Sequence, residues 1–278
     1  MQSVTRTVAG PDGHLNWARI ASLTEPAALA TVIGIDGSAP RKAGARMLVF
    51  ADGRSEGTVG GGNFEFQVIT AAKAAILARA PCRFAVHLTR DLGMCCGGAM
   101  EVYIEPILPP PQLTIYGAGH VALPTAALAL STGFAVAIVD ERDDFATPER
   151  FPGCDVQCTD PRRHARGLAC GERSHILIVT HDHALDQDLL ETLLSRPWAW
   201  CGLIGSRAKI AKFYLRLRAA GADEALFTRV SAPVGLDVGA ETPEEIAVSI
   251  VAELIALRRG RSGEITRMSA GGLTGRKA

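Results

Sequence analysis

After a run of prolines at residues 109–111, the sequence alternates apolar segments with amphipathic ones, and this alternation restricts the possible folds more than any other feature of the chain. The segments LTIYG, FAVAIVD, SHILIVT and WCGLIG are almost continuously apolar, which is typical of strands that helices cover on both faces of a sheet. The segments between them place apolar residues at helical spacing, as LDQDLLETLLS does at residues 185–195. The alternation predicts an α/β fold with a doubly wound, Rossmann-like parallel sheet.

The region before the prolines has a different pattern, in which strand-like segments flank one long helical segment. LATVIGI and ARMLVF precede the helical segment FQVITAAKAAILARA, and RFAVHLT and AMEVYIEPI follow it. Proline favours an extended chain and donates no ladder hydrogen bond, so the proline run predicts a domain boundary. We expect an N-terminal mixed α+β domain over residues 1–108, the Rossmann-like domain over 112–260 and a flexible tail over 261–278.

The segment AETPEEIAVSIVAELIALRRG carries the clearest helix signals in the chain. Thr242 is a favourable N-cap residue, Pro243 suits the first helical position, and Glu245 completes a capping box. The pattern predicts a well-defined last helix in the Rossmann-like domain.

Composition limits the classes of partner and the compartment. The formal net charge is zero, with 29 basic and 29 acidic residues, so no overall field favours nucleic acid or an anionic membrane. The stretch 121–139 is apolar enough to resemble a membrane span, but Pro124 and Gly133 divide it into a helix, a turn and a strand. We see no signal peptide, and the seven cysteines include no C-x-x-C pair. A soluble, cytoplasmic protein without a disulfide framework is expected.

The segment YGAGHVA joins a predicted strand to a predicted helix and matches the pattern G-x-G-x-x-G/A. Gly117 and Gly119 let the backbone approach a phosphate, and the helix N-terminus supplies free amides. Asp140 ends the next strand, where a ribose-binding acid would lie in a dinucleotide-binding fold. His120, inside the loop, would contact the ligand or face solvent. The alternative is that the glycines only permit a tight turn between strand and helix.

The segment THDHALD follows another strand of the same predicted sheet. Ligands of such folds bind beyond the carboxyl ends of the strands, so His181 is a candidate contact. Two histidines two positions apart make an incomplete metal site. The alternative is a polar loop in which Asp182 caps the next helix.

The segment GLIGSRAK follows the next strand and starts a helix. Gly205, Ser206 and Arg207 resemble an anion cradle at the helix N-terminus, and Lys209 adds charge. The alternative is an ordinary serine-capped helix with solvated cations.

Glycine is unusually dense in GTVGGGNFE, which opens the predicted helix of the first domain. Consecutive glycine amides at a helix N-terminus form an anion-binding nest. A glutamate in the first turn also suits the helix dipole as a structural residue. With the preceding segment GSAPRKAGARMLV, the candidate contacts are Arg41, Gly60, Gly61, Gly62 and Glu65.

The segment CCGGAMEV places Cys96, Gly97 and Gly98 directly before a strand. Glycine in a strand-rich region often marks a bulge or the close approach of a ligand. A thiolate there would contact a metal or a sulfur-bearing ligand, and the alternative is a buried structural thiol. We assign no role to Cys95.

Together these segments resemble the XdhC/CoxI family, the accessory proteins for maturation of molybdenum hydroxylases such as xanthine dehydrogenase. In the first domain the resemblance rests on GSAPRKAGARMLV, GTVGGG and CGG. In the second it rests on GAGHVA, VDER, THDHALD, GLIGSRAK and PVGLDVGAETPEEIAVSIVAELIA. It extends to about Gly260. Asn63 and Cys95 depart from the pattern.

The resemblance implies an accessory protein, not an enzyme, that binds the molybdenum cofactor, molybdopterin. Such a chaperone protects the cofactor while a cysteine desulfurase installs its sulfido ligand, and delivers it to the cofactor-carrying subunit of xanthine dehydrogenase. The candidate residues above would then contact the cofactor across a cleft between the two domains, and the protein would hold no metal of its own. A homo-oligomer, a homodimer in the simplest case, is expected.

Two other functions stay open. The Rossmann-like domain would bind NAD(P) if the chain were an NAD(P)-dependent oxidoreductase, although no convincing proton donor for hydride chemistry is evident. The domain would have an empty nucleotide site if it were only a scaffold that docks partners.

Overall fold

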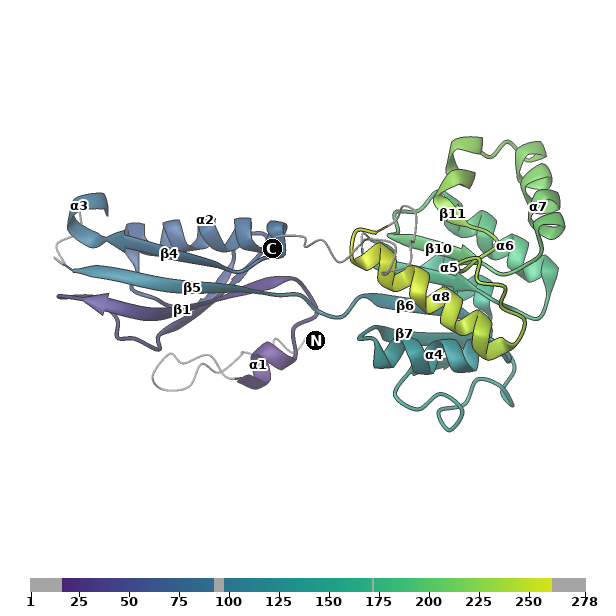
Figure 1. Ribbon diagram of the computed structural model, residues 1–278, viewed down its shortest axis with the longest axis horizontal. Helices are drawn as coiled ribbons and strands as arrows, with labels where there is room; N and C mark the ends of the chain where they lie inside the picture. The colour runs from purple at the N-terminus through teal and green to yellow at the C-terminus, as the bar shows by residue number, and fades with distance from the viewer. Residues whose placement is uncertain (1–16, 93–97, 172, 262–278) are drawn as a thin grey trace, which may run out of the picture. The chain divides into compact units, whose positions relative to one another are not determined.

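The computed structural model describes residues 17–92, 98–171 and 173–261. The chain divides into two compact units, unit 1 up to Pro109 and unit 2 from Pro110 (Figure 1). This boundary lies inside the proline run. Cys95, Cys96 and Gly97 lie outside the described residues, as does the expected flexible tail from residue 262 onward.

Unit 1 is built on sheet A, an antiparallel sheet with the strand order β3-β2-β1-β5-β4. Its described elements are α1 (Trp17–Ala21), β1 (Ala27–Asp36), β2 (Arg46–Phe50), β3 (Ser55–Gly57), α2 (Gly62–Ala78), β4 (Cys82–His87), α3 (Leu88–Leu92) and β5 (Ala99–Ile107). Helix α2 covers one face, because Phe64, Val68 and Ala72 pack against the alternating inward residues of β1 and β5. Leu23 packs on Leu48 in a smaller cluster that includes Ile20 of α1.

Unit 2 is built on sheet B, in which every neighbouring pair of strands is parallel. Its strands are β6 (Gln112–Tyr116), β7 (Ala135–Asp140), β8 (Asp155–Cys158), β9 (Ser174–Ile178), β10 (Trp200–Leu203) and β11 (Val230–Ser231). Their spatial order is β11-β10-β9-β6-β7-β8, the arrangement of a doubly wound Rossmann sheet. The predicted fold class is therefore confirmed.

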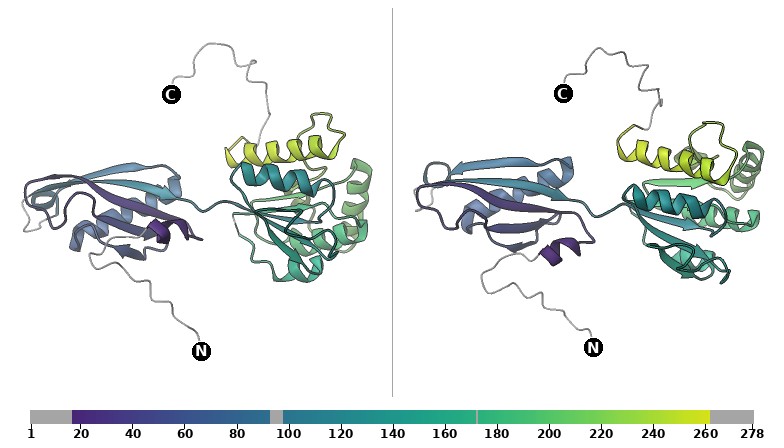
Figure 2. Two further views of the ribbon diagram at one scale, coloured as in Figure 1. Left: turned by 90° about the horizontal axis from the view of Figure 1, so that it is seen from below. Right: turned by 60° about the horizontal axis from the view of Figure 1, so that its bottom comes forward.

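Helices cover both faces of sheet B. They are α4 (Ala122–Ser131), α5 (Pro161–Gly167), α6 (His183–Leu194), α7 (Arg207–Ala219), the 3₁₀ helix η1 (Glu224–Arg229) and α8 (Pro243–Arg258). Helices α4 and α8 lie side by side on one face, as Figure 2 shows, and share a core with β6 and β7. Helices α5, α6 and α7 contribute to the core on the other face. The predicted capping box of α8 forms, with Thr242 and Glu245 each bonding the other's backbone.

The apolar stretch 121–139 folds into α4, a turn at Gly133 and β7, as the sequence predicts. In the described part of the chain, no helix has the length and apolar character needed to cross a membrane. The short strands β3, β8 and β11 lack apolar runs, so the sequence pattern did not predict them. Strand β8 is important below because it lines a pocket.

Candidate functional site

Three of the predicted segments of unit 1 meet at one end of sheet A. Asp36 at the end of β1 pairs with Ala99 at the start of β5. A Cβ on Gly98 would lie 2.4 Å from the carbonyl oxygen of Ser38, and a Cβ on Gly60 would lie 2.7 Å from the ring of Pro40. Real Cβ atoms are not found this close to such groups. These glycines are therefore required where the chain packs on itself.

The glycine loop before α2 holds a carboxylate that belongs to the chain. Oε1 of Glu65 accepts hydrogen bonds from the amides of Val59 (3.2 Å) and Gly61 (3.1 Å), and from the hydroxyl of Thr58. The amide of Gly60 donates to that same hydroxyl at 3.2 Å. Glu65 thus has the structural role that the sequence left open, and it occupies donors that an external anion would need.

The other predicted contacts of unit 1 are less constrained. Gly62 is the first residue of α2, and Arg41 is exposed on the loop after β1. Cys96 and Gly97 lie outside the described residues, so their predicted roles stay predictions.

The glycine loop of unit 2 connects β6 to α4. A Cβ on Gly117 would lie 2.5 Å from the carbonyl oxygen of Val179, and its φ of 110° is strained for other residues. Gly119 is different, because a Cβ there would meet no atom within 4 Å. The N-terminus of α4 has no side-chain cap and no acidic residue in its first turn, and His120 beside it is exposed. The fold explains Gly117, whereas Gly119 leaves backbone open to an approaching group.

Asp140 is buried at the end of β7 and fixes this loop. Its Oδ2 accepts from the amide of Ala118 (2.8 Å) and from Nη2 of Arg142 (2.7 Å), and its Oδ1 accepts from the amide and Nε of Arg142 (3.0 and 2.9 Å). Burial alone would raise the pKa of Asp140, but these hydrogen bonds hold it below its ordinary value. Both oxygens are engaged inside the protein, so Asp140 holds the glycine loop in place instead of presenting a free acid to a ribose.

His181 is exposed beyond the end of β9. Asp182 caps α6 through the amide of Ala184 at 2.8 Å, which is the structural alternative that the sequence offered. Asp186, which was not among the predicted residues, is fully buried and accepts hydrogen bonds from the hydroxyl of Thr180 (2.6 Å) and from Nζ of Lys209 (2.7 Å). Its position on the apolar stripe of α6, three residues before Leu189, was the available signal.

The loop after β10 is a serine-capped helix start, since Ser206 accepts from the amide of Lys209 at 3.2 Å. The alternative of solvated cations describes Arg207, whose side chain is 88% exposed, but not Lys209, which is 13% exposed and paired with Asp186. A Cβ on Gly205 would lie 2.7 Å from Cδ of Lys209, so this glycine leaves room for the lysine to reach inward.

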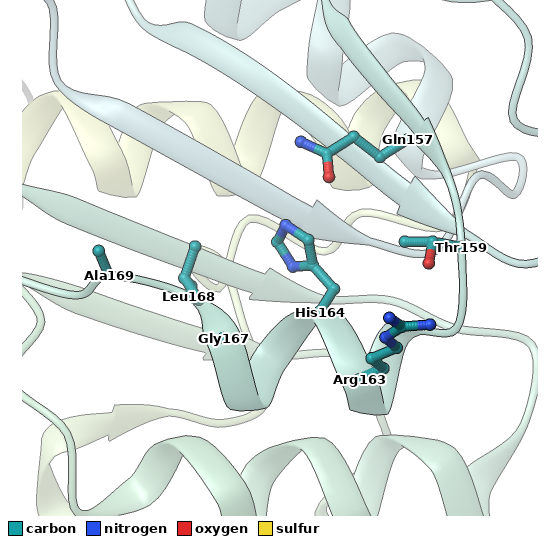
Figure 3. A pocket seen from close by; sticks show the side chains of 7 residues that line it. All are labelled: Gln157, Thr159, Arg163, His164, Gly167, Leu168 and Ala169. Atoms are coloured by element: carbon teal, nitrogen blue, oxygen red, sulfur yellow. The ribbon is translucent and has the colours of Figure 1, made fainter. Parts of the chain in front are cut away.

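A further feature, which the sequence analysis did not predict, is a pocket of about 610 Å³ between β8 and α5. Figure 3 shows side chains from both elements facing it. Nδ1 of His164 lies 3.0 Å from the hydroxyl of Tyr116, the buried residue directly before the glycine loop. The Asp160–Pro161 pair, an N-cap followed by proline, was the available sign of a helix here.

The parallel topology brings the predicted contacts of unit 2 to one edge of sheet B, because each follows the carboxyl end of a strand or lies at it. They are Gly117, Gly119, His120, Asp140, His181, Gly205, Ser206 and Arg207. In the ranges 17–92, 98–171 and 173–261, three or more histidine, cysteine or acidic side chains do not gather into a group able to hold a metal ion.

Comparison with known proteins gives matches over both units. The family model described as the XdhC Rossmann domain matches residues 113–254, and that of the XdhC and CoxI family matches residues 21–87. The chain is 36% identical over 253 residues to a protein of Escherichia coli (strain K12) called uncharacterized protein YqeB. It is 35% identical over 160 residues to a protein of Bacillus subtilis (strain 168) that is named as a probable subunit of xanthine dehydrogenase.

These alignments cover 86% and 57% of this chain but only 44% and 46% of the two relatives, so the chain spans less than half of their length. A solved structure described as a xanthine dehydrogenase from Bacillus halodurans matches 91% of this chain and 97% of its own, with 23% identity and a TM-score of 0.52. At that identity the match supports the fold alone. Since the XdhC Rossmann model by itself matches just over half of the residues, this chain belongs to the XdhC and CoxI family.

Proposed function

We propose that this protein is an accessory factor in the maturation of xanthine dehydrogenase or a related molybdenum hydroxylase, and that it binds the molybdenum cofactor and passes it to the apoenzyme. The proposal is supported by membership of the XdhC and CoxI family and by the Bacillus subtilis relative, whose name links it to xanthine dehydrogenase. A cysteine desulfurase that sulfurates the bound cofactor, and a homo-oligomeric state, belong to the same proposal.

The observation that carries the binding step is the open backbone at Gly119. The start of α4 has no capping side chain, and its first turn holds no acid that would repel an anion. The amide of Leu123 donates to the carbonyl of Gly119 at 3.3 Å and Pro124 has no N–H, so the amides left for an anion are those from Gly119 to Ala122. A helix N-terminus with free amides favours phosphate and other anionic groups. The cofactor is such an anion, and it would supply the molybdenum chemistry of the recipient enzyme.

The chain's own residues would then bind the cofactor and position it at this edge of sheet B. Asp140, neutralised by Arg142, holds the loop so that the amides keep their direction. The buried pair of Asp186 and Lys209 ties the loop after β9 to the helix after β10, which fixes the neighbouring part of the same edge. Exposed His120, His181 and Arg207 border this edge and are the proposed side-chain contacts.

Unit 1 has a weaker fit as a direct anion site. Glu65 already occupies amides of its glycine loop, and the loop would have to release that carboxylate to accept another anion. Arg41, Gly60, Gly61, Gly62, Cys96, Gly97 and Gly98 stay predicted contacts.

An NAD(P)-dependent oxidoreductase is the rival function, and the order of sheet B is compatible with it. The state of Asp140 argues against it, because both carboxylate oxygens are used by Arg142 and Ala118. A ribose hydroxyl would have to displace one of these internal hydrogen bonds.

The test is an equilibrium titration of the purified full chain with the molybdenum cofactor, and separately with NAD⁺ and NADP⁺. Gly119→Asp introduces a carboxylate where the structure leaves space, and we expect at least a roughly tenfold loss of cofactor affinity from like-charge repulsion. Gly171→Asp is the matched control, since a Cβ at Gly171 also meets nothing within 4 Å. No cofactor binding by the wild type, or nicotinamide-dependent turnover, would overturn the proposal.

A further inference from the structure

The pocket between β8 and α5 is an open surface hollow, large enough for a small molecule and lined mainly by polar side chains. Its volume of about 610 Å³ falls within the usual range for bound ligands, roughly 300–1,000 Å³. Gln157 and Thr159 line it from β8 and the residue after it, and Arg163 and His164 line it from α5. It is distinct from the glycine loop, although Tyr116, at the start of that loop, reaches His164.

A hydrogen-bond acceptor lies on one side of the pocket. The side-chain nitrogen of Gln157 donates to Oδ2 of Asp155 at 2.8 Å in an exposed contact, which favours one orientation of the amide. Its oxygen is thereby directed toward the pocket, and Figure 3 shows it on the side that faces His164.

A hydrogen-bond donor is fixed on the other side. The Tyr116 hydroxyl is fully buried, and among the described residues Nδ1 of His164, at 3.0 Å, is its hydrogen-bond partner. The hydroxyl must donate to satisfy its own hydrogen, so Nδ1 accepts and Nε2 carries the proton. Burial lowers the pKa of His164 and raises the pKa of Tyr116, so both are neutral at neutral pH. In Figure 3 the imidazole points toward Gln157.

The two ends of the pocket differ. Arg163 and Thr159 lie together at one end, and Leu168 and Ala169 lie at the other (Figure 3). Arg163 is exposed, and it forms no ion pair with any carboxylate in the described parts of the chain. Its guanidinium is therefore free to take a phosphate, which arginine binds with two parallel hydrogen bonds.

We propose that this pocket binds a phosphorylated nitrogen heterocycle with a lactam edge, whose adjacent N–H and C=O groups pair with Gln157 and His164 while its phosphate pairs with Arg163. The pterin phosphate moiety of the molybdenum cofactor has this chemistry, and so does a guanine nucleotide. If the ligand is the molybdenum cofactor, this inference rests on the proposed function, and the pocket is the subsite for the pterin. A guanine nucleotide would make it a nucleotide site on the same domain.

The test uses the full-length protein and four probes, namely the molybdenum cofactor, GMP, AMP and inorganic phosphate. Gln157→Leu removes the acceptor, and we expect the affinity for lactam probes to fall roughly tenfold. AMP presents its donor and acceptor in the reverse order, N6–H outside the ring and N1 within it, so it should bind the wild type more weakly than GMP does. Gln157→Leu should therefore reduce the affinity for AMP less than the affinity for GMP. Arg163→Ala should weaken every phosphorylated probe roughly tenfold. Arg166→Ala, on an exposed arginine of the same helix outside the pocket, is the control.

Binding of the cofactor that is lost in Gln157→Leu and Arg163→Ala supports the pterin source, and the same pattern with GMP alone supports the nucleotide source. The pocket proposal is overturned if neither probe binds, or if both variants bind as the wild type does. If cofactor binding is lost only in Gly119→Asp, and GMP binding is unchanged in both pocket variants, the pocket proposal fails while the proposed function stands. Thermal unfolding of each variant shows whether it is folded.

Discussion

Both units carry a glycine loop that leads into a helix. In both loops a carboxylate of the chain accepts hydrogen bonds from backbone amides. In unit 1 this is Glu65, half-buried, which bonds Val59 and Gly61. In unit 2 it is Asp140, buried, which bonds Ala118 and is paired with Arg142. The two acids differ in which backbone amides at the helix start they leave without a side-chain partner.

Glu65 lies in the first turn of α2 and occupies the amides that made the segment look like an anion nest. Asp140 reaches the loop from a neighbouring strand and leaves the start of α4 without a side-chain cap. A dense run of glycines is therefore a poor guide to an anion site when an acid follows within one helical turn. We therefore expect the loop of unit 2 to accept an anion more readily than the loop of unit 1.

The largest effect should come from the glycine that unit 2 needs for its own packing. Gly117→Ala forces a side chain against Val179 at a positive φ, and we expect a loss of about 3 kcal/mol in unfolding free energy from the combined clash and backbone strain. Gly119→Ala should cost little and can even stabilise the chain slightly. Chemical denaturation followed by the fluorescence of Trp198 and Trp200, both in unit 2, measures this. Equal losses for the two variants would mean that Gly119 is also required by the fold.

The next effect concerns the buried acid of unit 2. Asp140→Asn removes the charge that neutralises Arg142, and we expect unfolding of unit 2 to become easier by about 2 kcal/mol because charge-assisted hydrogen bonds are lost. Arg142→Met should give a loss of the same order, with a double variant less damaging than the sum. Additive losses would contradict the idea that the two residues act as one unit.

A smaller effect is expected for the acid of unit 1. Glu65→Gln keeps one carbonyl oxygen for the amides but removes the charge, so unit 1 should lose about 1 kcal/mol. Trp17, which stacks with Arg46 of unit 1, gives the fluorescence signal. A loss larger than that of Asp140→Asn would reverse the comparison between the two loops.

The smallest effect is a dependence of unit 2 stability on pH. Burial lowers the pKa of His164 and of His175 below the ordinary value of 6.5. Between the folded and unfolded pKa values of these histidines, the unfolded chain binds more protons than the folded chain. The stability that the two neutral histidines contribute is therefore fully present above about pH 6.5 and is lost as the pH falls below it. Unfolding free energies measured from pH 7.5 down to 5.5 should decline. His175→Gln should reduce the slope, and a slope that stays flat in the wild type would contradict the prediction.

Sequence patterns were sufficient for the parts of the fold that repeat a strong period. The strands of sheet B near its centre and the capping box of Thr242 and Glu245 follow from local signals. The short strand β8 does not, because its residues gain their place from pairing with β7 and not from an apolar run. The pocket that β8 lines was missed for the same reason.

The candidate site shows the same division between features that local sequence predicts and features that depend on residues distant in the chain. Glycine positions could be found from sequence, but whether each serves packing or a ligand depends on atoms far away in the chain, such as Pro40 beside Gly60 and Val179 beside Gly117. The pairing of Asp186 with Lys209 depends on two helices meeting. A charged residue on an apolar helical stripe was the one local sign of it.

The most direct measurement compares cofactor binding by two full-length variants, Gly119→Asp in unit 2 and Glu65→Gln in unit 1. We predict that the molybdenum cofactor binds Gly119→Asp at least roughly tenfold more weakly than the wild type, and binds Glu65→Gln with unchanged affinity. The opposite result, a changed affinity in Glu65→Gln with normal binding by Gly119→Asp, would place the anion at the glycine loop of unit 1 and contradict the assignment to unit 2.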